Sequence, residues 1–102
     1  MWSQLISIQV KPGSDIDALI DAIKAAEQPG SGLISETFMR DQNDPCRFYV
    51  VPLFRTEEEA RAREADPRRA EASATIQSLM RDILAAPPQF TDLVVLEHWV
   101  VE

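Results

Sequence analysis

The chain has 102 residues, 45% of them hydrophobic, with a formal net charge of −7 and a single cysteine. This length predicts one domain over residues 1–102, and the acidic balance argues against binding to a nucleic-acid backbone. A lone cysteine forms no internal disulfide, and the sequence shows neither a secretory signal pattern nor a membrane-spanning apolar run, so we expect a cytoplasmic protein with no membrane partner.

The first predicted element is a strand over residues 2–11. Apolar and polar side chains alternate along it, Ile6, Ile8 and Val10 against Ser7 and Gln9. This period is typical of a half-buried strand. We expect the apolar parity to face the helices and the polar parity to face the other side of the sheet.

A helix is predicted after the Lys-Pro-Gly turn at residues 11–13. Ser14 and Asp17 have the spacing of an N-terminal cap. The apolar side chains that follow recur at helical spacing: Ile16, Leu19, Ile20 and Ile23. We expect the helix to end before Pro29 and Gly30, a pair that favours a turn.

The patterns of Leu33–Met39 and Arg47–Phe54 predict two strands, separated by turn residues at 41–45. They are expected to form a hairpin. Pro52 cannot donate a backbone hydrogen bond to a neighbouring strand, so we expect a bulge there.

Residues 56–84 predict a helical segment with a break at Asp66 and Pro67. A proline inside a helix loses a hydrogen bond, whereas at the first position of a new helix it is tolerated. We therefore expect two helices, the first capped by Thr56 and the second by Asp66. Apolar residues at helical spacing mark the buried side of the second helix: Ala72, Ile76, Leu79 and Ile83.

Leu93–Val101 predicts the last strand, and both of its parities are mostly apolar. The resulting order, β-α-β-β-α-β, is that of an α+β ferredoxin-like fold, with a four-stranded antiparallel sheet and both helices on one face. Two helices leave the second face of the sheet uncovered, and an uncovered apolar face calls for a partner. We expect a homodimer in which the two sheets pack face to face.

Several features together resemble the antibiotic biosynthesis monooxygenase family, whose members are dimeric α/β barrels. These features are the order of the elements, the Lys11-Pro12-Gly13 end of the first strand, Pro29-Gly30, the Arg40-Asp41 turn and the broken helix of the EEEARAREADPRR type. The resemblance implies a pocket between sheet and helices, with the broken helix in its wall. The family includes cofactor-free oxygenases of quinols and polycyclic phenols, haem-degrading enzymes and domains with no known activity.

Departures from the family pattern argue against haem degradation. Where the haem-degrading members carry Asn, Trp and His, this chain has Ile6, Ala62 and Ala72, so no imidazole is available there as an axial ligand. Many oxygenase-like members carry a His where this chain has Arg63, and their Glu-x-Trp pattern is replaced by residues 52–54.

His98, the only histidine, is the candidate catalytic base because an imidazole titrates near neutral pH. The alternative is a histidine without a catalytic role, either partly exposed on the strand or paired with Glu97 or Glu36. The candidate substrate-binding residues are three aromatic side chains that could stack on or bond to a ring, and two family positions: Trp99, Tyr49, Phe38, Ile6 and Arg63. As neighbours in a strand, His98 and Trp99 would point to opposite faces, so only one of them would line the pocket.

No cysteine-histidine cluster has metal spacing and no glycine-rich loop suits a phosphate, so we expect neither a metal nor a cofactor. Two functions stay open. One is a cofactor-independent monooxygenase that binds a small aromatic quinol or phenol between sheet and helices and lets the substrate itself reduce O₂. The alternative is a non-catalytic ligand-binding or structural dimer built on the same fold.

Overall fold

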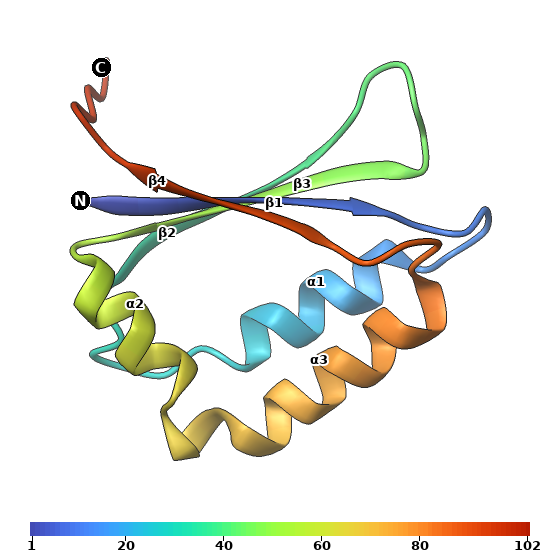
Figure 1. Ribbon diagram of the computed structural model, residues 1–102, viewed down its shortest axis with the longest axis horizontal. Helices are drawn as coiled ribbons and strands as arrows, with labels where there is room; N and C mark the ends of the chain where they lie inside the picture. Colours follow the sequence, from blue (N-terminus) through green and yellow to red (C-terminus); the bar gives the residue numbers. More distant parts are fainter.

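The computed structural model describes residues 1–102 and confirms the predicted order of elements (Figure 1). The helical segment before the last strand consists of three pieces, because a 3₁₀ turn, η1, joins its two α-helices. The elements are β1 (Trp2–Gln9), α1 (Ile16–Ala25), β2 (Leu33–Arg40), β3 (Arg47–Phe54), α2 (Glu57–Glu64), η1 (Pro67–Arg69), α3 (Ala70–Ile83) and β4 (Gln89–Val94). No helix has both the length and the apolar content that crossing a membrane requires.

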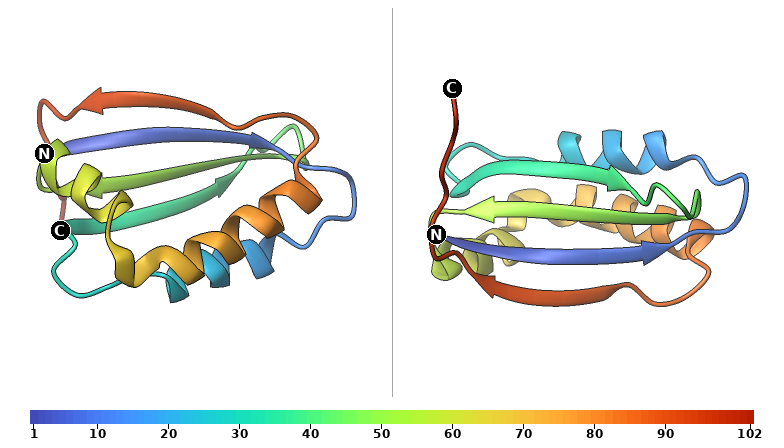
Figure 2. Two further views of the ribbon diagram at one scale, coloured as in Figure 1. Left: turned by 60° about the horizontal axis from the view of Figure 1, so that its bottom comes forward. Right: turned by 90° about the horizontal axis from the view of Figure 1, so that it is seen from above.

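The four strands form one open antiparallel sheet in the order β2-β3-β1-β4. All helices lie on one face of this sheet, and the other face carries no element of the chain (Figures 1 and 2). The structure therefore has the predicted ferredoxin-like fold. We call the two sides of the sheet the helix face and the open face.

The predicted orientation of β1 is confirmed. Ile8 is buried on the helix face and, with Val10 just beyond the strand, packs against Leu19 of α1. Ser7 has the opposite parity, and its Oγ accepts a hydrogen bond of 2.8 Å from Arg47 of β3. A second, separate cluster of buried side chains joins Trp2, Phe54 and Ala60 near α2. The hydrophobic core thus has two parts along the sheet.

The caps of the helices agree with the sequence at α2 but not at α1, and Asp66 caps the 3₁₀ turn η1 rather than α3, which has no side-chain cap. Thr56 caps α2 as predicted, since its Oγ1 accepts the N–H of Glu59 at 3.1 Å. The N-cap of α1 is Asp15 rather than Ser14, because the Asp15 carboxylate accepts the N–H of Ala18 at 3.1 Å. The Ser14 hydroxyl instead donates to the backbone oxygen of Lys11 at 2.6 Å, closing the preceding turn.

The predicted bulge at Pro52 is absent. The β1–β3 register is the same on both sides of Pro52, with Ser3 opposite Leu53 and Ile6 opposite Val50. The missing N–H is accommodated by a gap in the β1–β3 pairing, because no residues pair between the Ser3–Leu53 pair and the Ile6–Val50 pair. The register shift of the sheet lies instead in β2, near Leu33.

The prediction of a last strand over Leu93–Val101 was wrong, because β4 spans Gln89–Val94. The physical reason is that β4 is an edge strand with β1 as its only neighbour. Trp2 at the start of β1 pairs with Val94, and the final backbone bond joins the Val95 N–H to the Met1 oxygen. Residues 95–102 have no strand to pair with and extend away from the sheet on its open side (Figure 1).

Candidate functional site

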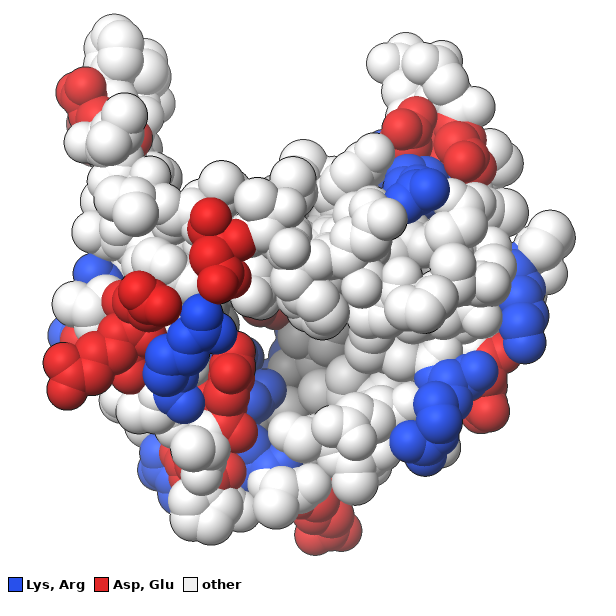
Figure 3. Space-filling view, in the orientation of Figure 1, with Lys and Arg blue, Asp and Glu red and all other residues white.

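A cavity of about 190 Å³ lies between the helix face of the sheet and the three helices. Its walls come from both parts of the core and from every helix. Most of the lining residues are apolar, and three of them are aromatic. The apolar residues are Trp2, Ile6, Ile8, Leu19, Ile23, Val50, Pro52, Phe54, Ile76, Met80 and Phe90. The space-filling view shows the hollow beneath the sheet, with charged side chains gathered on the α2 side (Figure 3). The two parts of the core are thus separated by a chamber.

The break between α2 and α3 shapes this chamber. Arg63 precedes the break and Arg69 follows it, and both line the cavity. In an unbroken α-helix with 3.6 residues per turn, two side chains six residues apart would point about 120° away from each other. The turn at Asp66 and Pro67 removes this divergence, so that the two guanidinium groups converge on one space.

Asp66 holds the break in place. Its carboxylate accepts the backbone N–H of Arg68 at 2.9 Å and pairs with the Arg68 guanidinium at 2.7 Å. These hydrogen bonds keep the pKa of Asp66 below its usual value. Arg68 also donates to the backbone oxygen of Pro29 at 3.3 Å. The break is therefore tied to the loop that follows α1.

Arg63 is fixed by two contacts. Its guanidinium lies 5.5 Å from the centre of the Phe54 ring and 3.4 Å from the carboxylate of Glu27. Burial alone would raise the pKa of Glu27, but the Gln28 N–H, Ser31 and Arg63 outweigh it and hold that pKa below the usual value. Arg63 and Glu27 therefore form a charge pair at the edge of the cavity.

Arg69 is the most buried charged side chain, with 8% of its surface exposed. Its Nε donates to the backbone oxygen of Ala26 at 3.3 Å, the only hydrogen bond that its side chain makes. Burial and the nearby Arg63 lower its pKa, although an arginine stays protonated at any physiological pH. The remaining N–H groups of Arg69 have no acceptor in the protein, and the side chain lines the cavity.

Glu36, on β2, is the third charged group in this space. It is half-buried, lines the cavity, and makes neither a hydrogen bond nor an ion pair. Burial raises its pKa, and the opposing influence of Arg63 and Arg69 does not cancel the effect. A carboxylate that is poorly solvated and unpaired is a good proton acceptor, and groups of this kind are concentrated at functional sites.

Two further cavities adjoin the first. One of about 360 Å³ shares Ile23, Glu36 and Arg63 with it. The other, of about 210 Å³, lies between α1 and the β2–β3 hairpin and is lined by Phe38 and Tyr49. Three of the predicted substrate-binding residues, Ile6, Arg63 and Phe38, therefore line the space between sheet and helices. Tyr49 also borders the hairpin cavity, but it lies opposite Ser7 and shares the parity of the open face.

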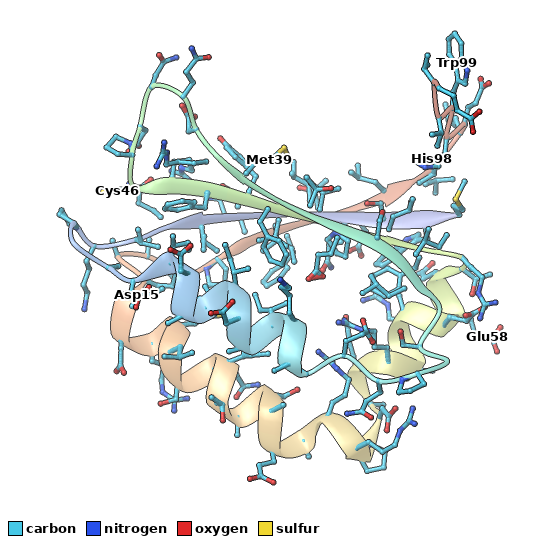
Figure 4. The ribbon with its side chains drawn as sticks, turned by 180° about the vertical axis from the view of Figure 1, so that it is seen from behind. Asp15, Met39, Cys46, Glu58, His98 and Trp99 are labelled. Atoms are coloured by element: carbon cyan, nitrogen blue, oxygen red, sulfur yellow. The ribbon has the colours of Figure 1, made fainter.

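His98 and Trp99 line none of these three cavities. Both belong to the segment 95–102, which leaves the sheet on the side opposite the helices (Figure 4). Trp99 is 79% exposed. Both residues were expected on the last strand, but β4 ends at Val94, so neither reaches these cavities within a single chain. Their roles as base and stacking residue stay predictions.

Sequence reasoning missed Glu36 and Arg69 as members of the cavity. Two signals were available. Glu36 has the same strand parity as Phe38, a predicted ligand contact, so the two share a face. Arg69 lies three and seven residues before Ala72 and Ile76, which places it on the predicted buried side of the helix. A charged side chain usually indicates an exposed position, but Arg69 is buried and Glu36 is half-buried.

No group of three His, Cys, Asp or Glu side chains lies close enough together to hold a metal ion. Comparison with known proteins gives no match to a family model or to a curated protein sequence. Solved structures, in contrast, match over nearly the whole chain.

A protein from Deinococcus radiodurans, provisionally assigned as an antibiotic biosynthesis monooxygenase, has 13% identity and a TM-score of 0.73, covering 100% of this chain and 99% of that one. A Nitrosomonas europaea protein with the same provisional assignment has 19% identity and a TM-score of 0.71, covering 95% and 100%. A mutant of SnoaB, a cofactor-independent oxygenase from Streptomyces nogalater, has 10% identity and a TM-score of 0.70, covering 95% and 94%. At these identities the likeness concerns the fold, and this chain has the fold of proteins named antibiotic biosynthesis monooxygenases.

Proposed function

We propose that this protein is an oxygenase that acts on a small aromatic quinol or phenol without a metal or a prosthetic group. The observation that carries the proposal is the chamber between sheet and helices, where aromatic walls surround an unpaired carboxylate and a buried guanidinium. The names of structurally similar proteins, among them a cofactor-independent oxygenase, support the same reaction class.

The chemistry that such a chamber supports begins with loss of a proton. An electron-rich phenolate or quinol anion is a far better reductant than its neutral form, and it can reduce O₂ directly. For a quinol, one oxygen atom enters the ring and the other leaves as water, giving a hydroxyquinone, so the substrate supplies all four electrons. The protein would exclude water, orient the ring and stabilise the anion.

The side chains that would perform these tasks come from different elements. Trp2, Phe54 and Phe90 offer ring surfaces for stacking. Arg69 supplies positive charge inside an apolar wall, where an electrostatic interaction is stronger than in water. Ile6 and Met80 contribute to the walls that keep the chamber dry. The arrangement thus joins a hydrophobic ring site to a charged end.

We also propose that the working form is a homodimer that closes the open face. Apolar side chains lie on this face and are partly or largely exposed, including Leu93 at 40% and Met39 at 43%. Figure 4 shows Met39 on the side of the sheet away from the helices. Two such sheets packed face to face would form the dimeric α/β barrel predicted from the sequence.

A second candidate function is ligand binding without turnover. The observation in its favour is that no histidine and no cysteine lines the three cavities. The two functions share the binding step and differ in the consumption of oxygen.

The experiment that separates them is a series of quinols and phenols followed with an oxygen electrode, with ligand binding measured in parallel. Uptake of O₂ with equal formation of hydroxylated product supports the oxygenase, and binding without uptake supports the second candidate. Elemental analysis of the same sample should find no stoichiometric metal. His98→Ala tests the predicted base, since it should abolish turnover and retain binding if His98 reaches the ligand in the assembled protein, whereas Trp99→Ala should then leave binding unchanged.

A further inference from the structure

We propose that Glu36 takes the hydroxyl proton of a single-ring phenol bound in the cavity, and that Arg69 holds the phenolate that forms. This inference rests on the proposed function for its choice of ligand class. It concerns binding and proton transfer, both of which precede any reaction with oxygen.

The size of the cavity sets the size of the ligand. A dry apolar cavity of about 150 Å³ is enough to bind benzene, and this cavity has a volume of about 190 Å³. One substituted ring therefore fits. A fused polycyclic ligand would also need the adjoining cavity, beyond Glu36 and Arg63.

The charged groups around the cavity differ in how well they are already paired. Arg63 faces Glu27 at 3.4 Å, so its charge is largely satisfied. Arg69 has only a backbone oxygen as partner, and Glu36 has none. The other charged groups that face this space are Glu64 of α2 and, from the adjoining cavity, Lys24 of α1. The chamber thus holds an unpaired cation and an unpaired carboxylate. A ligand that gives a proton to the carboxylate and places its own negative charge beside the cation would satisfy both groups.

The proton balance follows from these partners. The proposed transfer starts from the ionised form of Glu36 and from a neutral phenol. On binding, the O–H bond of the phenol breaks and the proton forms an O–H bond with Glu36, so the complex gains a phenolate and a neutral carboxylic acid. Burial favours the neutral form of Glu36, and Arg69 favours the anionic form of the ligand, so both partners drive the same transfer. No proton is exchanged with the solvent.

The test uses 4-nitrophenol, whose anion is coloured, bound to the full-length protein without oxygen at a pH below the ionisation of the free probe. Proton release is measured at the same time by calorimetry in buffers of different ionisation enthalpy. For the wild type we expect the anion spectrum to appear on binding with no proton released. For Glu36→Gln we expect the probe either to stay neutral or to release one proton per complex. The exposed Glu58 of α2 offers a matched control, Glu58→Gln, which should behave as the wild type (Figure 4).

Arg69→Met should weaken binding of 4-nitrophenol at least tenfold while leaving binding of 4-nitroanisole unchanged, because the methyl ether has no proton to lose. Unchanged binding of the ether also shows that the variant is folded. Arg69→Lys keeps the cation, so its affinity for 4-nitrophenol should lie between those of the wild type and Arg69→Met. An anion spectrum without proton release in Glu36→Gln would overturn the proposal, as would a wild type that binds the probe only in its neutral form or binds neither probe. Absence of oxygen uptake with any quinol would refute the proposed oxygenase and leave this proton transfer standing.

Discussion

The two faces of the sheet carry different chemistry on the same strands. On the helix face, even-numbered residues of β1 and β3 surround a chamber that contains Glu36 and Arg69. On the open face, the odd-numbered parity presents apolar side chains such as Leu5, Val51 and Leu93, and no charged cluster. Alternation along a strand therefore separates two tasks that need opposite surfaces, ligand chemistry on one side and association on the other. The predictions below test this division.

The largest effect is expected on assembly. Leu93→Lys places a charge on the open face, where a partner sheet would leave it buried and unpaired at a cost of several kcal/mol. We expect association to weaken about a hundredfold or more, because each 1.4 kcal/mol corresponds to roughly a factor of ten. Val94→Lys is the matched control, since Val94 has the opposite parity and is 77% exposed. Sedimentation should show a dimer for the wild type and for Val94→Lys, and a species of 11.5 kDa for Leu93→Lys. A wild type that sediments only as a monomer at micromolar concentration would refute the dimer.

The second prediction contrasts truncations on the two faces of β1. Ile8 is 2% exposed in the core, so Ile8→Ala should lower the free energy of unfolding by about 2–5 kcal/mol at any protein concentration. Leu5 has the opposite parity, so Leu5→Ala should lower the stability in a way that depends on protein concentration, as expected for an interface residue. Thermal unfolding over a wide concentration range would measure both. Equal behaviour of the two variants would contradict the division between core and interface.

The third prediction concerns Glu36 and pH. Because burial raises the pKa of Glu36 in the folded protein, its neutral form favours folding below the ordinary pKa of 4.5 and this contribution is lost as the pH rises through the folded pKa. Glu36→Gln, which cannot ionise, should therefore melt a few degrees above the wild type near pH 8 and at the same temperature as the wild type in acid. A variant that is less stable than the wild type near pH 8 would show that the carboxylate has an unseen partner.

The smallest effect, of opposite sign, is expected at Glu27. Its pKa is lowered, so its ionised form stabilises the protein above the ordinary value of 4.5, and this contribution is lost as the pH falls through the folded pKa. Glu27→Gln should lower the melting temperature slightly near neutral pH, and the difference should vanish in acid. The screened, partly exposed pair with Arg63 makes a small change the reasonable expectation. Substitution by Gln would then change the melting temperature in opposite directions at Glu27 and Glu36, although both residues lie at the same charged end of the cavity.

Most of the fold could be predicted from the sequence because each element carries its own period and its own stop signals. The strand parity of Ile6 and Ile8, the hairpin turn and the break at Pro67 all depend on local chemistry. The end of β4 depends on something that is not local, namely where β1 stops, and the apolar residues after Val94 therefore misled the prediction.

The candidate site divides in the same way. Ile6, Phe38 and Arg63 follow from aromatic character and family position, and they line the helix-sheet cavities, whereas Tyr49 has the parity of the open face. Arg69 was not recognised from composition, because the residues on both sides of it are exposed. Its spacing to Ala72 and Ile76 indicates the buried side of the helix, but its approach to Arg63 depends on the angle between α2 and α3, which no short window of sequence contains.

The gap that Pro52 leaves in the β1–β3 pairing has a consequence for motion. The ladder between these central strands is divided into two blocks, one at Trp2 and Ser3 and the other from Ile6 onward. Short blocks of backbone hydrogen bonds open more readily than a continuous ladder. We therefore expect the amide protons of the block next to α2 to exchange with solvent faster than those of the longer block. The part of the chamber wall formed by Trp2 would then open more often than the part formed by β1 from Ile6 onward.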